Sequence, residues 1–321
     1  MPLRQHRPPV APRTGNPPAP EKHLPFFHAG GGYALGAFIG RWVPRGVAQA
    51  IGCSISLLYA RLQSGRVAIV QKNLALIEPD GVSPEQARAV FREFGRTMGD
   101  YFHLANRSTE EALQLVSEHI GFEHFETVRQ LGRGGLLLTP HLSFFELGGA
   151  VAHAKGFPIV VLTRSESTPA LTTWRAAYRA RWGMETVEVG SLEDQFAFLD
   201  VIRHLNAGCF VAALVDRPDS PKASPVTLPG GVIGFSSAVL LLALACQCPV
   251  LPVTTVRLPD GTYRVEAHEP FFVERDTLGD KAGLLQRYSQ RLADVFAPVI
   301  RRSSSQWFHF VPLAPPPTDG K

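Results

Sequence analysis

Short apolar runs alternate with amphipathic stretches along most of the chain after residue 120. A short apolar run bounded by turn residues is typical of a buried strand, and apolar residues at helical spacing are typical of a helix. The expected strands are 135–139, 158–162, 186–189, 209–215 and 250–256, and the expected helices are 145–155, 170–181, 192–206 and 236–246. This alternation predicts an α/β fold with a mixed, largely parallel sheet flanked by helices.

Residues 231–256 carry no charged side chain, so on length alone this segment could cross a membrane. The serine pair 236–237 and the prolines at 249 and 252 divide it. We therefore interpret it as a buried helix followed by a buried strand, with a transmembrane helix as the alternative.

The segment 65–118 has a helical pattern in two parts. Residues 66–74 form the first part, and a loop follows at 79–81. Ser83 then provides a helix cap, and apolar residues continue at helical spacing through Phe102. We expect these apolar residues to lie in the core.

The first 62 residues differ in composition from the rest. Residues 1–23 are rich in proline, which disfavours helices and central strands, so we expect a disordered extension. Residues 24–62 are apolar, but Arg41, Pro44 and Arg45 leave no uninterrupted run long enough to span a bilayer. We expect a pair of membrane-interface helices here, a main domain over 63–315 and a tail over 316–321.

Charge and cysteine content narrow the partners and the compartment. The 321 residues have a net charge of +4 and a pI near 9.0. This weak basicity, without aromatic repeats or a zinc spacing, argues against nucleic acid and fits an anionic membrane surface or a phosphorylated substrate. The four cysteines lie in apolar surroundings, as expected of reduced thiols, and predict neither a metal nor a cofactor. No secretory signal is recognisable, so we expect a cytoplasmic catalytic part.

A histidine and a glutamate lie where the strand 135–139 gives way to a helix. His141 follows the strand, and Glu146 lies near the helix start. Glu146 could accept a hydrogen bond from one ring nitrogen of His141, leaving the other nitrogen to take a proton from a hydroxyl. The pair predicts a general base with its orienting carboxylate. The alternative is that His141 packs at the strand end and Glu146 is a first-turn acid favoured by the helix dipole.

Further polar residues lie at the carboxyl ends of later strands or in the element that follows, where α/β sheets build their sites. They are Arg164, Arg179, Arg181, Asp216 and Arg217. Because arginine binds phosphate through two planar donors, we predict that this group binds an anionic part of the substrate. A solvated helix face is the alternative for the helical arginines.

Seven segments together carry a family resemblance. They are Arg66-x6-Asn73-Leu74, the stretch 139–148 around His141, Thr163-Arg164, Arg179-x-Arg181-x-Gly183, Asp216-Arg217, 248–253 and Gln306-Trp307-Phe308. With these segments the chain, from about residue 65 to 312, resembles the late (lauroyl/myristoyl) acyltransferases of lipid A biosynthesis, within the His-x4-Asp/Glu glycerolipid acyltransferases.

The resemblance implies an acyltransferase that moves a fatty acyl group from a thioester, on acyl carrier protein or CoA, to a hydroxyl of a membrane lipid or glycolipid. A lipid A precursor is the acceptor that it suggests, at the cytoplasmic face of the cell inner membrane. His141 matches the family base and Glu146 its partner, while Arg164 and Asp216 match supporting positions. The fold implied is glycerolipid acyltransferase-like, without a metal or other cofactor.

Two other functions are compatible with the sequence. The segment 234–238 approximates the Gly-x-Ser-x-Gly turn of serine hydrolases, with Ser236 as the nucleophile. The residues that could complete its triad are Asp260, Asp276, His268 and His309. A non-catalytic membrane-surface protein with the same fold is the other alternative.

Overall fold

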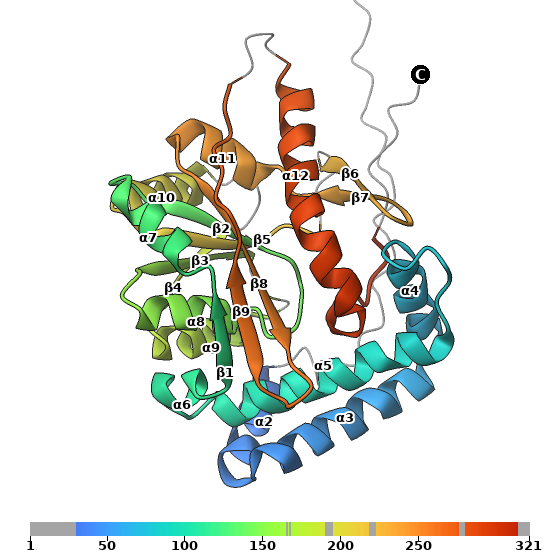
Figure 1. Cartoon of the computed structure of the whole chain (residues 1–321). Coiled ribbons are helices and arrows are strands. Elements are labelled where there is room, and N and C mark those ends of the chain that lie inside the picture. Colours follow the sequence, from blue (N-terminus) through green and yellow to red (C-terminus); the bar gives the residue numbers. More distant parts are fainter. Residues whose placement is uncertain are drawn as a thin grey trace, which may run out of the picture.

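The computed structural model describes residues 30–164, 166, 168–189, 195–217, 223–275 and 280–313. The expected extension 1–23 and tail 316–321 lie outside these residues. Within them the chain forms a seven-stranded sheet with helices on both faces, a small two-stranded sheet, and a layer of helices at one end (Figure 1).

The large sheet is mostly parallel, as the sequence predicted. Its order is β1-β9-β8-β2-β5-β3-β4, and β8 with β9 is its antiparallel pair. The strands are β1 Val116–Ile120, β2 Gly135–Thr139, β3 Ile159–Arg164, β4 Glu185–Val189, β5 Phe210–Leu214, β8 Val250–Arg257 and β9 Tyr263–Ala267. The central strands are apolar along their length because helices cover both faces of the sheet.

The two faces of β2 contribute to separate hydrophobic cores. Leu136 and Leu138 pack with one core, and Leu137 with the other, because successive strand side chains point to opposite faces. The first core includes α10 (Gln195–Asn206), α11 (Ala238–Cys246) and α12 (Lys281–Arg302). The second includes α7 (Glu123–Gln130), α8 (Glu146–Ala154) and α9 (Pro169–Arg181).

Two expectations needed correction or refinement. The segment predicted to be helical up to residue 118 already enters strand β1 at Val116. The uncharged segment 231–256 divides as expected, but it begins with a strand, β7 (Gly231–Phe235), which pairs with β6 (Ser224–Leu228) before α11 and β8 follow. Across the described residues, no helix combines the length and the apolar character needed to cross a membrane.

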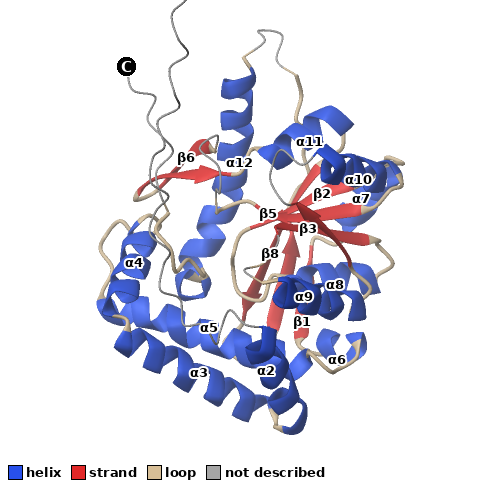
Figure 2. Ribbon diagram, turned by 180° about the vertical axis from the view of Figure 1, so that it is seen from behind, coloured by secondary structure: helices blue, strands red, loops and turns tan. Residues whose placement is uncertain are grey.

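The N-terminal helices are α2 (Gly30–Trp42), α3 (Arg45–Leu62), α4 (Ser64–Ala75), α5 (Pro84–Leu104) and α6 (Thr109–Leu113). They lie below the sheet in Figures 1 and 2, apart from α4, which lies at the side near α12. The Ser83 cap is confirmed: its hydroxyl accepts from Gln86 N, and the Gln86 side chain accepts from Ser83 N. α3 lies so close to α5 that a β-carbon on Gly95 would be 2.5 Å from the carbonyl oxygen of Gly52.

A buried aspartate joins this helical layer to the sheet. Asp100 on α5 accepts hydrogen bonds from Arg45 Nε at 2.7 Å and from Gln49 Nε2 at 2.9 Å, both on α3. Its other oxygen accepts from the hydroxyl of Tyr263 on β9 at 2.7 Å. The charge is thus buried with full hydrogen bonding, which fixes α3 relative to the sheet.

Candidate active site

The site lies at the carboxyl ends of two neighbouring parallel strands. β2 and β5 pair in register with Thr139 opposite Leu214. His141 and Asp216 each follow two residues beyond these positions, so the sheet brings the two side chains together. A topological crossover makes this possible, because β3 and β4 intervene in sequence but not in space.

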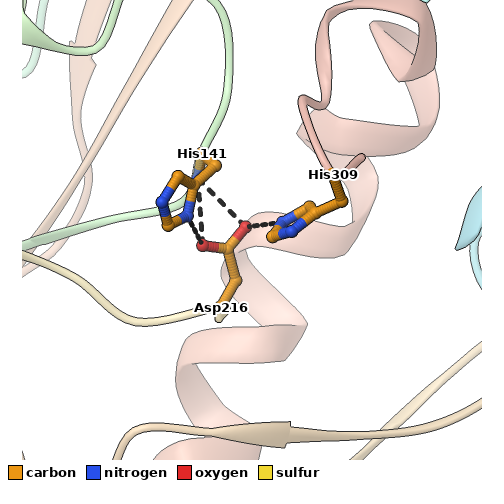
Figure 3. Close-up of side chains that lie close together, drawn as sticks. All are labelled: His141, Asp216 and His309. Carbon is orange, nitrogen blue, oxygen red and sulfur yellow. Dashed lines mark hydrogen bonds and ion pairs between the residues drawn. The ribbon is translucent and has the colours of Figure 1, made fainter. Parts of the chain in front are cut away.

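Asp216 is the hydrogen-bond partner of the His141 ring. Nδ1 of His141 lies 2.7 Å from Oδ1 of Asp216, and the His141 backbone N–H donates to both carboxylate oxygens at 3.0 Å. In Figure 3 the second ring nitrogen of His141 points away from Asp216. Since Asp216 accepts at Nδ1, Nδ1 carries the proton and Nε2 keeps its lone pair, which is the arrangement of a base.

Two residues from the C-terminal end of the described chain complete the contacts of Asp216. Trp307 Nε1 donates to Oδ2 at 2.8 Å, and His309 Nε2 lies 2.9 Å from the same oxygen (Figure 3 shows His309). Sequence reasoning did not connect either residue with Asp216. From the sequence, Trp307 was noted only as part of a segment that carries the family resemblance. His309 was considered only as a possible member of a serine hydrolase triad.

The two histidine rings beside Asp216 keep this carboxylate ionised although it is fully buried. Burial alone would raise the pKa of Asp216, but the rings of His309 and His141 beside it hold that pKa well below its usual range. The carboxylate therefore remains charged at neutral pH, where it orients the His141 ring without taking its proton.

His309 is held in its neutral form. Burial lowers the pKa of His309, against the opposing effect of Asp216. Its Nδ1 is buried and has no hydrogen-bond partner among the described residues, as fits a neutral ring that donates through Nε2. His141 differs, because 21% of its side chain is exposed and can meet a substrate.

His141, Asp216 and His309 also place three possible metal-ligand atoms within 4.8 Å of one another. The same atoms are already paired at hydrogen-bond distances, and Oδ2 of Asp216 additionally accepts from the Trp307 indole, which is a donor only. The donor set therefore fits a hydrogen-bonded network better than a cation site.

The loop after β2 is held by the chain that carries Trp307. Ser143 N donates to Gln306 O at 2.8 Å, and Phe308 N donates to His141 O at 2.9 Å, on either side of a bridge between Leu142 and Trp307. Ser143 has a positive φ of 51°, and its buried hydroxyl has no hydrogen-bond partner among the described residues. This local strain shows that the loop conformation is imposed by its surroundings.

Glu146, predicted to orient His141, is directed elsewhere. Its Oε1 lies 3.0 Å from Nε of Arg179, and the two side chains are 9% and 4% exposed. Arg181 donates to the carbonyl oxygen of Ala105 and contacts Asn106. The carboxylate beside the histidine comes from the neighbouring strand in space, which spacing along the sequence does not reveal.

The remaining predicted site residues lie at the same edge of the sheet. Arg164 ends β3 and Arg217 follows Asp216, and both are exposed. Since β5 separates β2 from β3 and neighbouring strands lie about 4.8 Å apart, Arg164 extends from a strand roughly 10 Å from the one that carries His141.

Ser236 does not lie in the setting that a hydrolase requires. The strand before it, β7, belongs to the antiparallel two-stranded sheet, whereas a nucleophile elbow follows a strand of the main parallel sheet. His309, one of the histidines proposed for that triad, is paired with Asp216.

A largely parallel α/β sheet with an oriented histidine at the carboxyl ends of its central strands is an arrangement typical of enzymes, and a histidine held in this way is chemically able to accept a proton. The family model for bacterial lipid A biosynthesis acyltransferases matches residues 29–313, nearly the whole chain. The chain belongs to this family and is an acyltransferase. A search of curated proteins gave no match.

Proposed function

We propose that the protein transfers a fatty acyl group from a thioester to a hydroxyl of a lipid A precursor or related glycolipid, with His141 as the general base. The observation that carries this proposal is the 2.7 Å contact between His141 Nδ1 and Asp216, which leaves the other nitrogen of this partly exposed ring to accept a proton. Family membership supplies the reaction class.

The proposed step needs no enzyme nucleophile. His141 Nε2 takes the proton of the acceptor hydroxyl while the hydroxyl oxygen forms a bond to the thioester carbon. The carbon–sulfur bond then breaks, and the imidazolium returns the proton to the departing thiolate. Asp216 stabilises the imidazolium throughout, because its buried carboxylate remains charged.

Arg164 and Arg217 are the residues that we assign to an anionic part of a substrate. Both are exposed at the carboxyl edge of the sheet, next to the strand ends that carry the site. Arg179 and Arg181, which the sequence also suggested for this role, instead support the site in our proposal through their contacts with Glu146 and Ala105.

We further propose that α2 and α3 dock on the membrane surface that holds the lipid acceptor. Both helices carry large apolar side chains that are exposed, with Trp42 and Leu62 exposed to 70% and 72%, and we call this set of side chains the apolar face. Its members are Leu35, Phe38, Ile39, Trp42, Val47, Ile51, Ile55, Leu58 and Leu62. On α3 they recur at helical spacing, opposite the side that packs on α5, which is the pattern of an interfacial helix.

The direct test is acyl transfer by purified His141→Ala protein. Turnover should fall by about 10²–10⁴-fold, the usual contribution of a general base, with the fold intact by circular dichroism. Ser236→Ala serves as the matched control and should be mild in effect. Wild-type turnover in folded His141→Ala protein, or the reverse ranking of the two variants, would contradict the proposal.

The substrates are identified by two further comparisons. Mass spectrometry of lipids from cells with and without the protein should show one acyl mass difference on a lipid A precursor or related glycolipid. Assays with acyl carrier protein and CoA thioesters should then separate the two donors, and activity with neither would exclude thioester transfer.

A further inference from the structure

We propose that Asn73 is a positioning residue for proton transfer, because its side chain holds the C-terminal segment that places Trp307 and His309 on Asp216. This inference rests on the proposed role of His141. Asn73 lies on α4, outside the site, and its side chain is not placed to contact a substrate.

The side-chain amide of Asn73 forms three hydrogen bonds, and all three are with the backbone of residues 309–313. Nδ2 donates to the carbonyl oxygens of His309 and Val311 at 2.9 and 2.8 Å, and Oδ1 accepts from Leu313 N at 3.1 Å. Asn73 is 4% exposed, so these backbone groups have no ready replacement in water. Arg66, two turns earlier on α4, donates to Phe310 O at 3.1 Å.

The segment that Asn73 holds is also attached on its other side. The Gln306 side chain bonds to the backbone N–H and carbonyl of Arg257 at 2.7 and 2.9 Å. Between these two attachments lie Trp307 and His309, which donate to Asp216. The segment is thus fixed at both ends, with the donors to the catalytic carboxylate in the middle.

Loss of the Asn73 contacts should release one end of this segment. The backbone carbonyl of His309 accepts a hydrogen bond from Asn73, and the His309 ring is bonded to Asp216. A shift of this backbone therefore moves the ring directly. Asp216 would then orient His141 less well, while residues exposed to substrates stay in place. The expected consequence is a lower kcat with unchanged KM for both substrates.

The test compares Asn73→Leu with Gln71→Leu. Gln71 lies on the same helix and also donates to a backbone carbonyl, but this carbonyl, at 2.5 Å, is that of Val82 in the loop before α5 and not one of residues 306–313. Asn73→Leu should lower kcat on the order of 10²-fold, as expected when catalytic groups are displaced by about 1 Å, and Gln71→Leu should leave it within twofold.

A spectroscopic measurement tests the structural part without any turnover. The chain has four tryptophans, and the indole N–H signal of Trp307 can be assigned by its absence in Trp307→Phe. In Asn73→Leu this signal should shift and exchange with solvent faster, because the bond to Asp216 is weakened. In Gln71→Leu it should match the wild type.

Arg66→Gln covers the case in which Asn73→Leu does not fold. It removes one contact with the same segment at a less buried position, so it should shift the Trp307 signal and lower kcat several-fold without changing KM. A folded Asn73→Leu with wild-type kcat, or an Arg66→Gln protein unchanged in both readouts when Asn73→Leu fails to fold, would overturn the inference. Full turnover in His141→Ala would instead overturn the proposed base and leave the Trp307 result standing.

Discussion

At the residue scale, two carboxylates near the site have different partners. Asp216 faces His141, whereas Glu146 faces Arg179. Neutralising Asp216 should therefore damage catalysis: in Asp216→Asn the new amide can no longer accept from His141, Trp307 and His309 together. We expect kcat to fall by about 10²–10⁴-fold, measured by steady-state acyl transfer on protein confirmed to be folded.

Neutralising Glu146 should instead damage stability. Glu146→Gln leaves the Arg179 guanidinium buried without a counter-charge, which costs on the order of 3 kcal/mol in the free energy of unfolding. Urea denaturation measures this directly. If Glu146→Gln keeps wild-type stability but loses turnover, Glu146 acts in catalysis, as the His-x4-Glu spacing first suggested.

The lowered pKa of His309 predicts how the free energy of unfolding changes with pH. Because burial lowers its pKa in the folded state below the ordinary value of about 6.5, the unfolded chain binds more protons, and stability falls as the pH drops below that value. Asp216 does not titrate in this interval, because its pKa lies well below the usual carboxyl range.

Urea unfolding at pH 7.5 and 5.5 checks this sign. The wild type should be less stable at pH 5.5, and His309→Gln should lose less between the two values, because glutamine can still donate to Asp216 but does not titrate. An equal loss in both proteins would assign the effect to other histidines with lowered pKa, namely His103, His119 and His268.

At the element scale, the loop after β2 carries strain at Ser143. A non-glycine residue at φ 51° and a buried, unpartnered hydroxyl are both unfavourable. Ser143→Gly removes both and should stabilise the protein by about 1 kcal/mol after the entropic cost of glycine. Ser143→Val should destabilise it, because a β-branched residue disfavours this backbone conformation. Thermal unfolding of the two variants should shift in opposite directions.

At the element scale, the sequence predicted some strands correctly but did not predict which strands are neighbours. β2 was predicted with its observed bounds, because an apolar run between glycine and proline is a strong local pattern. β1 was missed, since only its first residue is buried and the strand alternates little. The partner of His141 was assigned wrongly because strand order in space, β2-β5-β3, differs from order in the chain. Trp307 and His309 reach Asp216 only through tertiary packing.

At the scale of the whole molecule, the part of the apolar face that lies on α3 is held in place relative to the sheet that carries the site. Asp100 bonds to Arg45 and Gln49 of α3 and to Tyr263 of the sheet, so the face cannot swing freely relative to the site. A surface docked on this face would therefore lie at a set orientation to the carboxyl edge of the sheet. Such an orientation suits an acceptor whose hydroxyl is held at the membrane surface.

Vesicle binding tests this arrangement. Replacing Ile51, Ile55 and Leu58 with glutamine removes three half-exposed apolar side chains from α3 without touching its packing on α5. Each contributes about 1 kcal/mol when buried in the bilayer interface, so partitioning onto vesicles that contain anionic lipid should fall roughly 10²-fold. Leu199→Gln on α10, at an exposed apolar position away from this face, is the control.

Measuring acyl transfer by the same triple variant distinguishes a defect in membrane docking from a defect in catalysis. The triple variant should transfer acyl groups normally to an acceptor dispersed in detergent and poorly to the same acceptor in vesicles, because only the second requires docking on a lipid surface. Equal vesicle binding by the triple variant and the wild type would show that the apolar face of α3 does not contact lipid, and would point to another copy of the chain or a protein partner as its occupant.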